Sequence, residues 1–416
     1  MKKIISVLLF LGLALAAVAQ EQKNPEVVEL LRENIWRAGV NLCQYEVIPA
    51  PETAVPKGYK PFYISHYGRH GSRSDWSGDR YPRVQACLHK AADQGILTPE
   101  GQQLSITVDQ VIAGHNGMNG RLTAVGAREH RQIAGRMYDR YKKVFSKGRK
   151  VRAISSTVPR CLVSMNAFTA ELLSRNPRLD MSWDTGEESM KICSTGDSKE
   201  VREQVKKEVR RQRKLHKPDT TAFLGRVFTD PDAARSIVGN TARFMQDVYW
   251  MAAVCGSFEL GDGPYRLFKE DDIYWYCQII GMDIYMRQCN SIEFGDERME
   301  PVHALLNDIV TKADEAIATG AYAADLRFGH DWQLLAISSL IGIKGVAERM
   351  SYEQALLWPS FLYTPFAGNL QMIFYKNKAG RVLVKFYINE REATLIGLDG
   401  GPYYDWAEVK NYWSTK

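Results

Sequence analysis

Three stretches of the chain place a short apolar run directly before an amphipathic one. Residues 61–67 form a β-prone run that Gly68 ends, and residues 150–154 form a second, shorter run. The third run, residues 325–328, precedes apolar positions spaced three or four residues apart between 334 and 341. Short apolar runs indicate strands, whereas the wider spacing is typical of helices. Because strands alternate with helices, the pattern predicts an α/β fold with a mainly parallel sheet flanked by helices.

The middle of the chain, residues 171–320, has the spacing of helices almost throughout. Apolar residues recur there at helical intervals, at Val201, Val205, Val209, Phe244, Val248, Met251, Leu305, Ile309 and Ala313. Basic residues surround the three valines, at Lys206, Lys207, Arg210, Arg211, Arg213 and Lys214. Two interpretations of this basic stretch stay open. It is either the solvated face of a helix, or a basic wall that attracts a highly phosphorylated substrate.

The first residues have the layout of a secretory signal peptide. A basic start, Met1-Lys2-Lys3, precedes an apolar run over residues 4–16, and Ala17-Val18-Ala19 fits the small-x-small cleavage rule. The apolar run is too short to span a membrane comfortably. We therefore expect residues 1–19 to be removed and the protein to be exported to the periplasm or the medium, without stable membrane insertion. An uncleaved N-terminal anchor is the alternative.

Composition narrows the classes of partner. Of the 416 residues, 45% are hydrophobic and 25% are charged, which is typical of globular proteins. The chain is too long for one simple core. The net charge of +6 suits an anionic small-molecule substrate and argues weakly for nucleic acid. Seven cysteines are an odd number, so at least one is unpaired within the chain, and none forms a C-x-x-C motif.

Charged and polar residues follow each of the three predicted strands, where ligands bind in open α/β sheets. The candidates are Arg69, His70, Arg73, Arg160, His330 and Asp331. Each arginine can bind two phosphate oxygens at once, an imidazole can attack phosphorus, and a carboxyl group can protonate a leaving oxygen. Nucleotide-loop, dinucleotide-binding, serine-hydrolase and zincin motifs do not occur in the sequence. The set therefore predicts phosphoryl transfer that needs no cofactor and no metal ion.

These residues carry a resemblance to a known family. The pentapeptide at 69–73, Arg-His-Gly-Ser-Arg, resembles the R-H-G-x-R signature of the histidine acid phosphatases. His330-Asp331 is similar to the distal H-D pair of that family, and Arg160 is similar to its additional phosphate-binding arginine. Residues 365–370 and 389–392 resemble the C-terminal part of the multiple inositol polyphosphate phosphatases.

The resemblance implies a role for each residue and an architecture for the chain. His70 is the expected nucleophile and Asp331 the expected proton donor. The expected phosphate-binding residues are Arg69, Arg73, Arg160 and His330. The implied fold is a phosphoglycerate-mutase-like core, made of residues 20–170 and 321–416. Residues 171–320 are expected as a helical cap inserted into that core.

The implied function is hydrolysis of phosphomonoesters through a phosphohistidine, most of all inositol polyphosphates such as phytate. Two departures from the family favour a broad-specificity acid phosphatase instead. Ser74-Asp75 replaces the usual x-Pro after the signature, and Trp332 replaces the Glu that inositol polyphosphate phosphatases commonly carry at the distal site. A non-catalytic phosphate-binding protein is the third possibility, although simple binding needs neither a nucleophile nor an acid.

Overall fold

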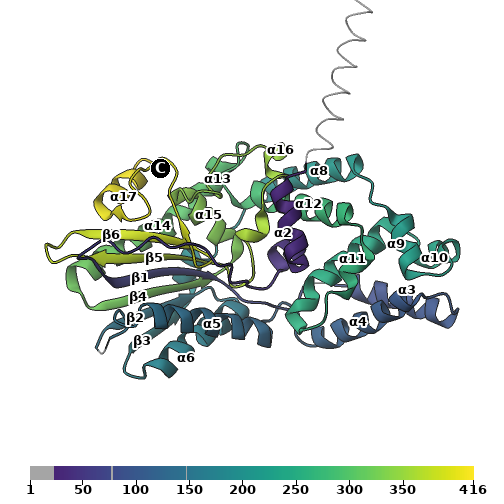
Figure 1. Cartoon of the computed structure of the whole chain (residues 1–416), viewed down its shortest axis with the longest axis horizontal. Helices are drawn as coiled ribbons and strands as arrows, with labels where there is room; N and C mark the ends of the chain where they lie inside the picture. The colour runs from purple at the N-terminus through teal and green to yellow at the C-terminus, as the bar shows by residue number, and fades with distance from the viewer. Residues whose placement is uncertain (1–22, 76–77, 147) are drawn as a thin grey trace, which may run out of the picture.

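Eight strands form one mixed sheet within residues 23–75, 78–146 and 148–416, the part of the chain that the computed structural model describes (Figure 1). The strands are β1 (Lys60–Arg69), β2 (Lys150–Ser155), β3 (Asp180–Thr185), β4 (Tyr322–Gly329), β5 (Asn369–Lys376), β6 (Val382–Ile388), β7 (Arg391–Ala393) and β8 (Tyr404–Asp405). Their order is β3-β2-β4-β1-β5-β6-β7, and β8 pairs with β6. The predicted signal peptide, residues 1–19, lies outside the described residues.

The sheet has a parallel half and an antiparallel half. Strands β3, β2, β4 and β1 are parallel neighbours, and helices connect β1 to β2, β2 to β3 and β3 to β4. Strand β5 pairs antiparallel with β1 and forms a hairpin with β6, to which β7 and β8 add antiparallel pairs. The α/β prediction is confirmed, and the strands predicted to carry the site all lie in the parallel half.

Different helices cover the two faces of the sheet (Figure 1). One face carries α5 (Ala124–Arg140) and α6 (Pro159–Arg175), and the other carries α14 (His303–Thr319), α15 (Asp331–Ile341) and α17 (Trp406–Trp413). Successive side chains of a strand point to opposite faces. Tyr63 of β1 accordingly packs with residues of α15, whereas Ile64 packs with residues of α5 and α6.

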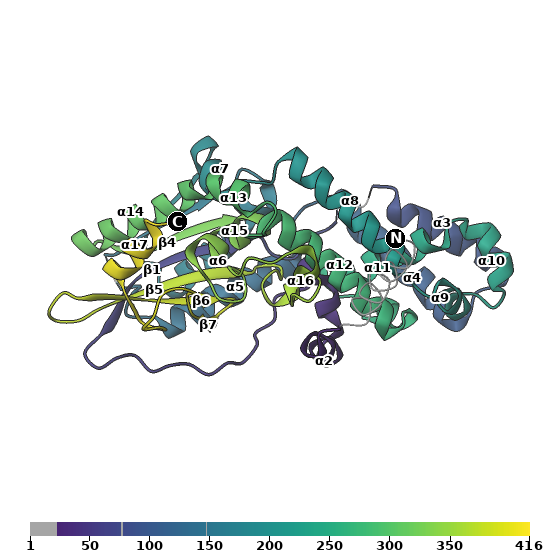
Figure 2. The same ribbon diagram turned by 90° about the horizontal axis from the view of Figure 1, so that it is seen from above.

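A second group of helices lies beyond the end of the sheet (Figures 1 and 2). It includes α3 (Arg80–Asp93), α4 (Pro99–His115), α8 (Lys199–Leu215), α9 (Thr220–Val227), α10 (Pro231–Val238), α11 (Thr241–Cys255) and α12 (Glu270–Gln288). Shorter helices are α2 (Pro25–Glu33), α7 (Glu187–Cys193), α13 (Gly295–Met299) and α16 (Tyr352–Ala355), with 3-10 helices η1 (Ile35–Leu42), η2 (Gly256–Phe258), η3 (Gly263–Leu267), η4 (Glu300–Val302) and η5 (Ser360–Leu362). We call α3, α4 and α8 to α12 the helical end.

The structure corrects the predicted boundaries of the inserted region. Strand β3 lies within 171–320 but pairs with β2 in the sheet, and α14 lies in the same range but packs against β1 and β4. Conversely, α3 and α4 fall in the predicted core but pack against α9, α10 and α11. The helical end is therefore assembled from two separate stretches of chain. Packing between distant segments decides which helices belong to this group, and the local spacing of apolar residues cannot predict it.

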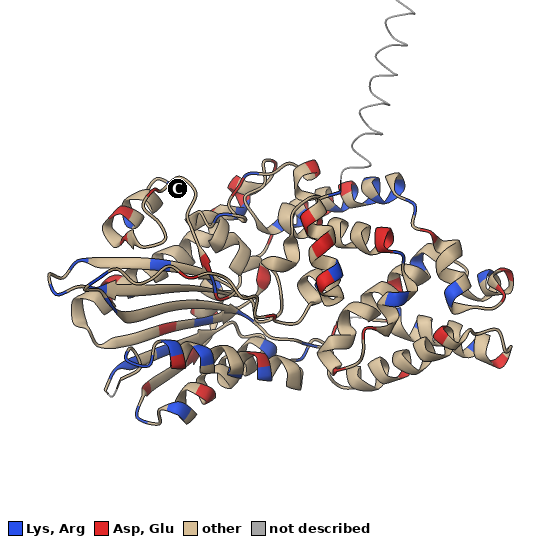
Figure 3. Cartoon of the chain, in the orientation of Figure 1, with Lys and Arg blue, Asp and Glu red and all other residues tan. Residues whose placement is uncertain are grey.

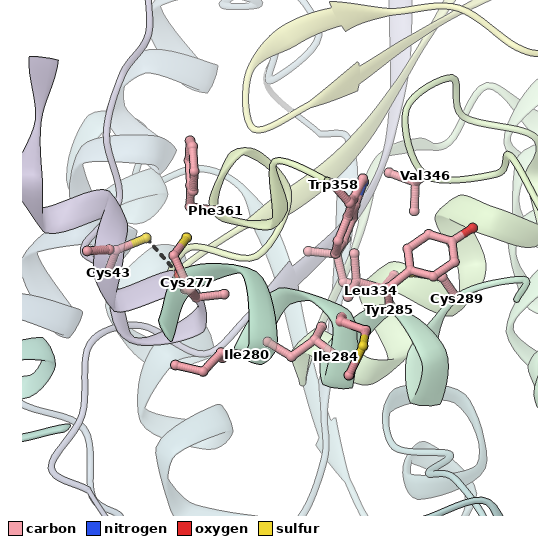
Figure 4. Packing of buried hydrophobic residues seen from close by; sticks show 14 of the residues in the cluster. Cys43, Cys277, Ile280, Ile284, Tyr285, Cys289, Leu334, Val346, Trp358 and Phe361 are labelled. Atoms are coloured by element: carbon pink, nitrogen blue, oxygen red, sulfur yellow. Dashed lines mark hydrogen bonds between the residues drawn. The ribbon is translucent and has the colours of Figure 1, made fainter. Parts of the chain in front are cut away.

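Helix α12 belongs to the helical end and also packs against α15, which covers one face of the sheet. Its side chains are buried on nearly every side, as expected for a helix inside a core. Figure 4 shows Ile284 and Tyr285 of α12 packed near Leu334 of α15 and Trp358. Cys277 and Cys289 lie on the same helix, and all seven cysteines of the chain are free thiols in the structure.

All six basic residues noted in the sequence between 206 and 214 lie on helix α8 (Figure 3). Val201 and Val205 are buried against the protein, which confirms the apolar stripe. Part of its charge is neutralised locally, since Lys206 pairs with Glu203 at 2.7 Å and Arg211 pairs with Glu208 at 2.6 Å. Among the described residues, no helix is long and apolar enough to cross a membrane.

Candidate active site

The ends of neighbouring strands place the predicted site residues together. In the parallel register of β1 and β4, Arg69 lies opposite Gly329. His70 and His330 therefore leave the sheet side by side. The backbone N–H of His70 donates to the carbonyl of Gly329 at 2.9 Å, and the two imidazole centroids are 5.7 Å apart.

Arg160 reaches the same edge from the first turn of α6. Pro159 takes the first position of that helix, where its missing N–H is not needed, so the helix begins just after β2 ends. The Arg160 side chain is buried, and its Nη2 lies 3.3 Å from Nδ1 of His330. The six predicted residues thus meet at the carboxyl edge of the parallel strands.

The loop after β1 is held by close backbone packing. A Cβ on Gly71 would lie 2.5 Å from the carbonyl oxygen of Gly126, so this position of the signature admits only glycine. The N–H of Gly71 donates to Ser164 Oγ at 3.1 Å. Glu129 of α5 accepts from the N–H and the hydroxyl of Ser72 at 2.7 and 2.8 Å. Buried contacts from two helices therefore hold the loop that carries His70 and Arg73.

The His70 imidazole is held in one tautomer. Its Nδ1 lies 3.0 Å from the carbonyl of Gly71, and a carbonyl only accepts, so Nδ1 carries the proton. Nε2 then carries a free lone pair, and no group of the described residues hydrogen-bonds to it. Burial lowers the pKa of His70 well below its ordinary value, and the positive charges of Arg69, Arg160 and Arg73 lower it further. The ring is a neutral base with an unengaged nitrogen.

Arg69 is almost completely enclosed. Its Nη1 donates to the carbonyl of Thr364 at 2.6 Å, its Nη2 pairs with Asp331 Oδ2 at 3.1 Å, and its guanidinium lies 4.8 Å from the ring centroid of Phe366. Burial lowers the pKa of Arg69 although Asp331 opposes that effect, and burial lowers the pKa of Arg160 to about 10. These two arginines hold positive charge that the protein compensates only in part.

Arg73 lies nearer the surface than the other two arginines and faces the helical end. Its Nη1 donates to the carbonyl of Ser74 at 2.8 Å and lies 3.6 Å from Asp75 Oδ1. Asp75 also accepts from Arg80 Nη1 at 2.9 Å and from the Tyr81 hydroxyl at 3.1 Å. Asp75, which replaces the usual proline, therefore connects the loop after β1 to α3.

His330 is engaged at both ring nitrogens. Arg160 only donates, so Nδ1 of His330 accepts, and Nε2–H donates to Ser156 Oγ at 3.2 Å. Trp332 stacks on the ring, with centroids 4.0 Å apart and planes 8° apart. Burial lowers the pKa of His330 to about 3, with Arg160 adding to that effect. In this structure, His330 orients Arg160.

Asp331 is the first residue of α15 and is buried. Its Oδ2 accepts from Arg69 and, at 3.1 Å, from Nδ2 of Asn41, while Oδ1 accepts from the Trp332 N–H at 3.0 Å. Burial acts to raise the pKa of Asp331, but Arg69, Asn41 and His330 outweigh it, and the pKa lies below its ordinary value. The role of proton donor, expected for Asp331 from the sequence, needs a carboxyl group that holds a proton. Without a bound phosphate, the carboxyl group is instead held in its ionised form.

The assembled groups suit an oxyanion. Guanidinium groups are donors only, and three of them converge on two neutral imidazoles. Among the described residues, no group of three or more His, Cys, Asp or Glu side chains is placed to hold a metal ion. The arrangement can bind a phosphate group, attack it with His70 and move a proton with Asp331.

Sequence reasoning missed two residues that support this geometry. Asn41 contacts Asp331 across 290 positions of sequence, and no motif surrounds it. Tyr67 accepts from the N–H of His330 at 3.1 Å and donates to the carbonyl of Cys193 at 2.9 Å. The position of Tyr67, two residues before Arg69 on β1, is the signal that could have identified it, because alternate residues of a strand lie on the same face of the sheet.

The fold matches those of solved phosphatases. The multiple inositol polyphosphate phosphatase of Bifidobacterium longum superposes with a TM-score of 0.69 and 17% identity, covering 91% of this chain and 97% of that one. The phytase from D. castellii gives a TM-score of 0.69 and 13% identity, covering 92% and 86%. The Klebsiella sp. ASR1 phytase gives 0.52 and 11%, covering 86% and 96%. No protein-family model and no curated protein sequence matches the chain. The predicted resemblance is confirmed at the level of the fold.

Proposed function

We propose that this protein is a histidine-type phosphomonoester hydrolase in which His70 is the nucleophile. The observation that carries the proposal is the state of that imidazole. It is buried and neutral, its proton is held on Nδ1, and its free Nε2 lies among three arginines. A phosphate-binding protein without catalysis needs the arginines but has no use for a fixed tautomer.

In the first step, Nε2 of His70 attacks phosphorus and the ester P–O bond breaks. Arg69, Arg73 and Arg160 neutralise the charge on the equatorial oxygens. His330 orients Arg160 through Nδ1, and the hydrogen that it can offer to a phosphate oxygen is the one on Nε2, which faces Ser156 in this structure. Asp331 gives its proton to the departing oxygen, which leaves as an alcohol, and the phosphoryl group stays on His70.

The proton on Asp331 comes with the substrate. A phosphate group competes with Asp331 for Arg69 and brings negative charge of its own. Both effects raise the affinity of Asp331 for a proton relative to the ligand-free state. Turnover is therefore expected to favour acid pH, where the monoanion of the ester delivers the proton as it binds.

In the second step, the alcohol is replaced by water. The Asp331 carboxylate takes a proton from that water as its oxygen attacks phosphorus, and the P–N bond to His70 breaks. Inorganic phosphate leaves as its monoanion with the proton that Asp331 took up, which restores the carboxylate, and the lone pair returns to Nε2. Each proton and bond is accounted for with the groups already present, so the cycle needs no cofactor.

Inositol polyphosphates, including phytate, are the substrates we propose. Solved proteins of the same fold are an inositol polyphosphate phosphatase and phytases, and the former was solved in complex with inositol hexasulfate. A polyanion also suits the exposed basic residues of α8. Export to the periplasm or the medium, proposed from residues 1–19, would place the enzyme where such esters are met outside the cell.

A broad-specificity acid phosphatase is the second candidate. The observation that favours it is Asp75, which sits between Arg73 and Arg80 and neutralises positive charge at the side of the site that faces α3. The similarity at 389–392 does not separate the two candidates. Asn389 Oδ1 accepts from the N–H of Asn369 at 2.8 Å, and the carbonyl of Gly368 accepts from the N–H of Arg69 at 2.8 Å, so this region supports the catalytic loop.

The test is phosphate release from phytate and from an aryl phosphate at mildly acid pH, with excess chelator, beside the His70→Ala variant. Preference for phytate that is lost in the variant and unaffected by chelator supports the proposal. Preference for the aryl ester supports the second candidate. Release of neither, with phosphate still bound, contradicts both and leaves a binding protein.

A further inference from the structure

The segment before the first strand contains a backbone conformation that its sequence does not favour. Val40, in η1, has a φ of +53° and a ψ of −108°, and its side chain is buried. A β-branched residue with positive φ is a costly outlier that persists only where the surrounding structure enforces it. Such strain concentrates at functional sites, so the turn points to a role for its neighbour.

Contacts from both parts of the molecule hold this turn. The Val40 carbonyl accepts from the N–H of Cys43 at 3.4 Å and lies 2.9 Å from its thiol. The Tyr249 hydroxyl, from α11, donates to the carbonyl of Ala38 at 2.6 Å. The carbonyl of Cys43 accepts from the N–H of Phe366, whose ring lies beside Arg69. The segment is therefore fixed to the helical end and to the catalytic loop together.

The turn presents the amide of Asn41 to the carboxyl group of Asp331. Nδ2 of Asn41 lies 3.1 Å from Oδ2, the oxygen that Arg69 also contacts at 3.1 Å. The Trp332 N–H holds the other oxygen. A substrate phosphate draws Arg69 toward itself, because arginine pairs with phosphate oxygens in a two-point contact. The Asn41 amide is neutral, so a substrate phosphate does not draw it away from Asp331 as it does Arg69.

We propose that Asn41 is a positioning residue that holds the carboxyl group of Asp331 toward the leaving oxygen once phosphate engages Arg69. The inference rests on the proposed function. It also assigns a role to the strained turn, because a relaxed backbone at Val40 would carry the amide away from the site. The segment before β1 thereby becomes part of the reaction centre.

The same contact sets how strongly Asp331 holds its proton. An amide N–H stabilises a carboxylate and not a carboxylic acid, so its removal raises the affinity for the proton. Other titratable or charged groups that act on Asp331 are Arg69, Arg73, Arg160, Arg287, His330, Tyr67 and Cys161. These groups remain in an Asn41 variant, so a change in the pH profile reports the amide.

The experiment compares the wild type with Asn41→Leu and Asn41→Asp, which keep the size of the side chain, and with Asn34→Leu as control. Asn34 lies in the same segment but caps η1 through the N–H of Trp36 at 3.1 Å. Initial rates are measured on glycerol phosphate, a poor leaving group, and on p-nitrophenyl phosphate, a good one, across pH 3 to 8. Thermal unfolding shows which variants are folded, and Asn41→Asp serves if leucine prevents folding.

We expect Asn41→Leu to lower kcat on glycerol phosphate about tenfold and to affect the aryl ester little, since only the poor leaving group needs the acid. The alkaline limb of kcat/KM should move to higher pH, further in Asn41→Asp than in Asn41→Leu, while Asn34→Leu keeps the wild-type profile. A raised KM with unchanged kcat would make Asn41 a substrate contact and overturn the inference, as would profiles equal to wild type. If the wild type hydrolyses neither ester, the proposed function fails and this inference fails with it.

Discussion

Arg152 and the arginines of the carboxyl edge lie on or just after the same parallel strands and differ in how they are paired; Arg152 is partly exposed, whereas Arg69 and Arg160 are buried. In the middle of the sheet, Arg152 on β2 contacts both carboxylate oxygens of Asp325, at 2.6 and 2.9 Å, and also pairs with Glu315 at 2.6 Å. At the carboxyl edge, Arg69 shares a single carboxylate with an asparagine, and Arg160 lies against a neutral imidazole.

The pKa directions follow this difference in pairing. Burial acts to lower the pKa of Arg152, but Asp325 and Glu315 more than compensate and raise it. At the edge of the sheet, burial prevails, and the pKa values of Arg69 and Arg160 are both lowered. A cation with its own carboxylates is part of the structure, whereas a buried cation left short of negative charge is prepared for an anion from outside.

The largest expected effect comes from removing the nucleophile. His70→Ala should lower the rate of phosphate release by at least about 10⁴-fold, because no other unengaged imidazole lies among the arginines in the described residues. Calorimetric titration with inorganic phosphate should still show binding, since all three arginines remain. If the variant keeps more than a few per cent of the wild-type rate, His70 is not the nucleophile. The difference in pairing between the two sets of arginines would then be no evidence for catalysis.

Asp331→Asn should have the next largest effect, and it should depend on the leaving group. We expect a loss of roughly 10²–10³-fold on alkyl phosphates and a much smaller loss on aryl phosphates, which leave without a proton. Rates measured on a series of esters with graded leaving-group pKa show this as a steeper dependence. An equal loss across the series would contradict the role of Asp331 as the proton donor.

Substituting leucine for one arginine of each kind, Arg160 and Arg152, directly tests the difference in pairing. Arg160→Leu should weaken phosphate binding about 10- to 100-fold and change the free energy of unfolding little, because the structure does not pair this charge. Arg152→Leu should leave binding nearly unchanged and lower the free energy of unfolding by roughly 2 kcal/mol, because buried Asp325 then keeps only the Tyr63 hydroxyl and the charge of Arg327 as partners. Titration calorimetry and chemical denaturation measure the two quantities. The reverse pattern would refute the comparison.

The smallest expected effect concerns His66, a buried imidazole on β1 that packs against aromatic rings. Its ring lies tilted against those of Phe168 and Phe328, and burial lowers its pKa from 6.5 to about 3. The unfolded chain therefore binds this proton more tightly, so the contribution is intact above about pH 6.5 and is lost as the pH falls toward 3.

The His66→Phe variant should lose less stability on acidification, by up to about 1.4 kcal/mol per pH unit in that window. Denaturation midpoints of the two proteins between pH 3 and 8 measure the difference. Parallel curves would mean that the ring is protonated in the folded state or that water reaches it.

Much of the site could be predicted because its residues cluster in short motifs. Arg69, His70 and Arg73 share one loop, and His330 and Asp331 are consecutive, so their types and spacing were visible without any contact. The parallel strands β1, β2 and β4 were visible as apolar runs. The antiparallel strands β5 to β8 were not predicted, since their pairing depends on a hairpin and on the free edge of β1.

The pairing of the charges could not be predicted. Nothing near Arg152 in sequence shows that it meets Asp325, and nothing near Arg160 shows that it meets His330. Both pairs cross more than 150 positions, as does the contact between Asn41 and Asp331. The boundaries of the helical end could not be predicted for the same reason. Helices α3 and α4 belong to it only because they pack against α9, α10 and α11.

The sequence by itself determined which chemical groups this protein has available and that they follow strands, because residue type and hydrophobic period are local properties of the chain. Only the tertiary structure decided which charges are compensated, which tautomer His70 adopts and that Asp331 is held ionised. Those properties depend on burial and on distances between segments far apart in the chain. The same strands therefore carry one set of arginines for stability and another, a few residues away, for an anion.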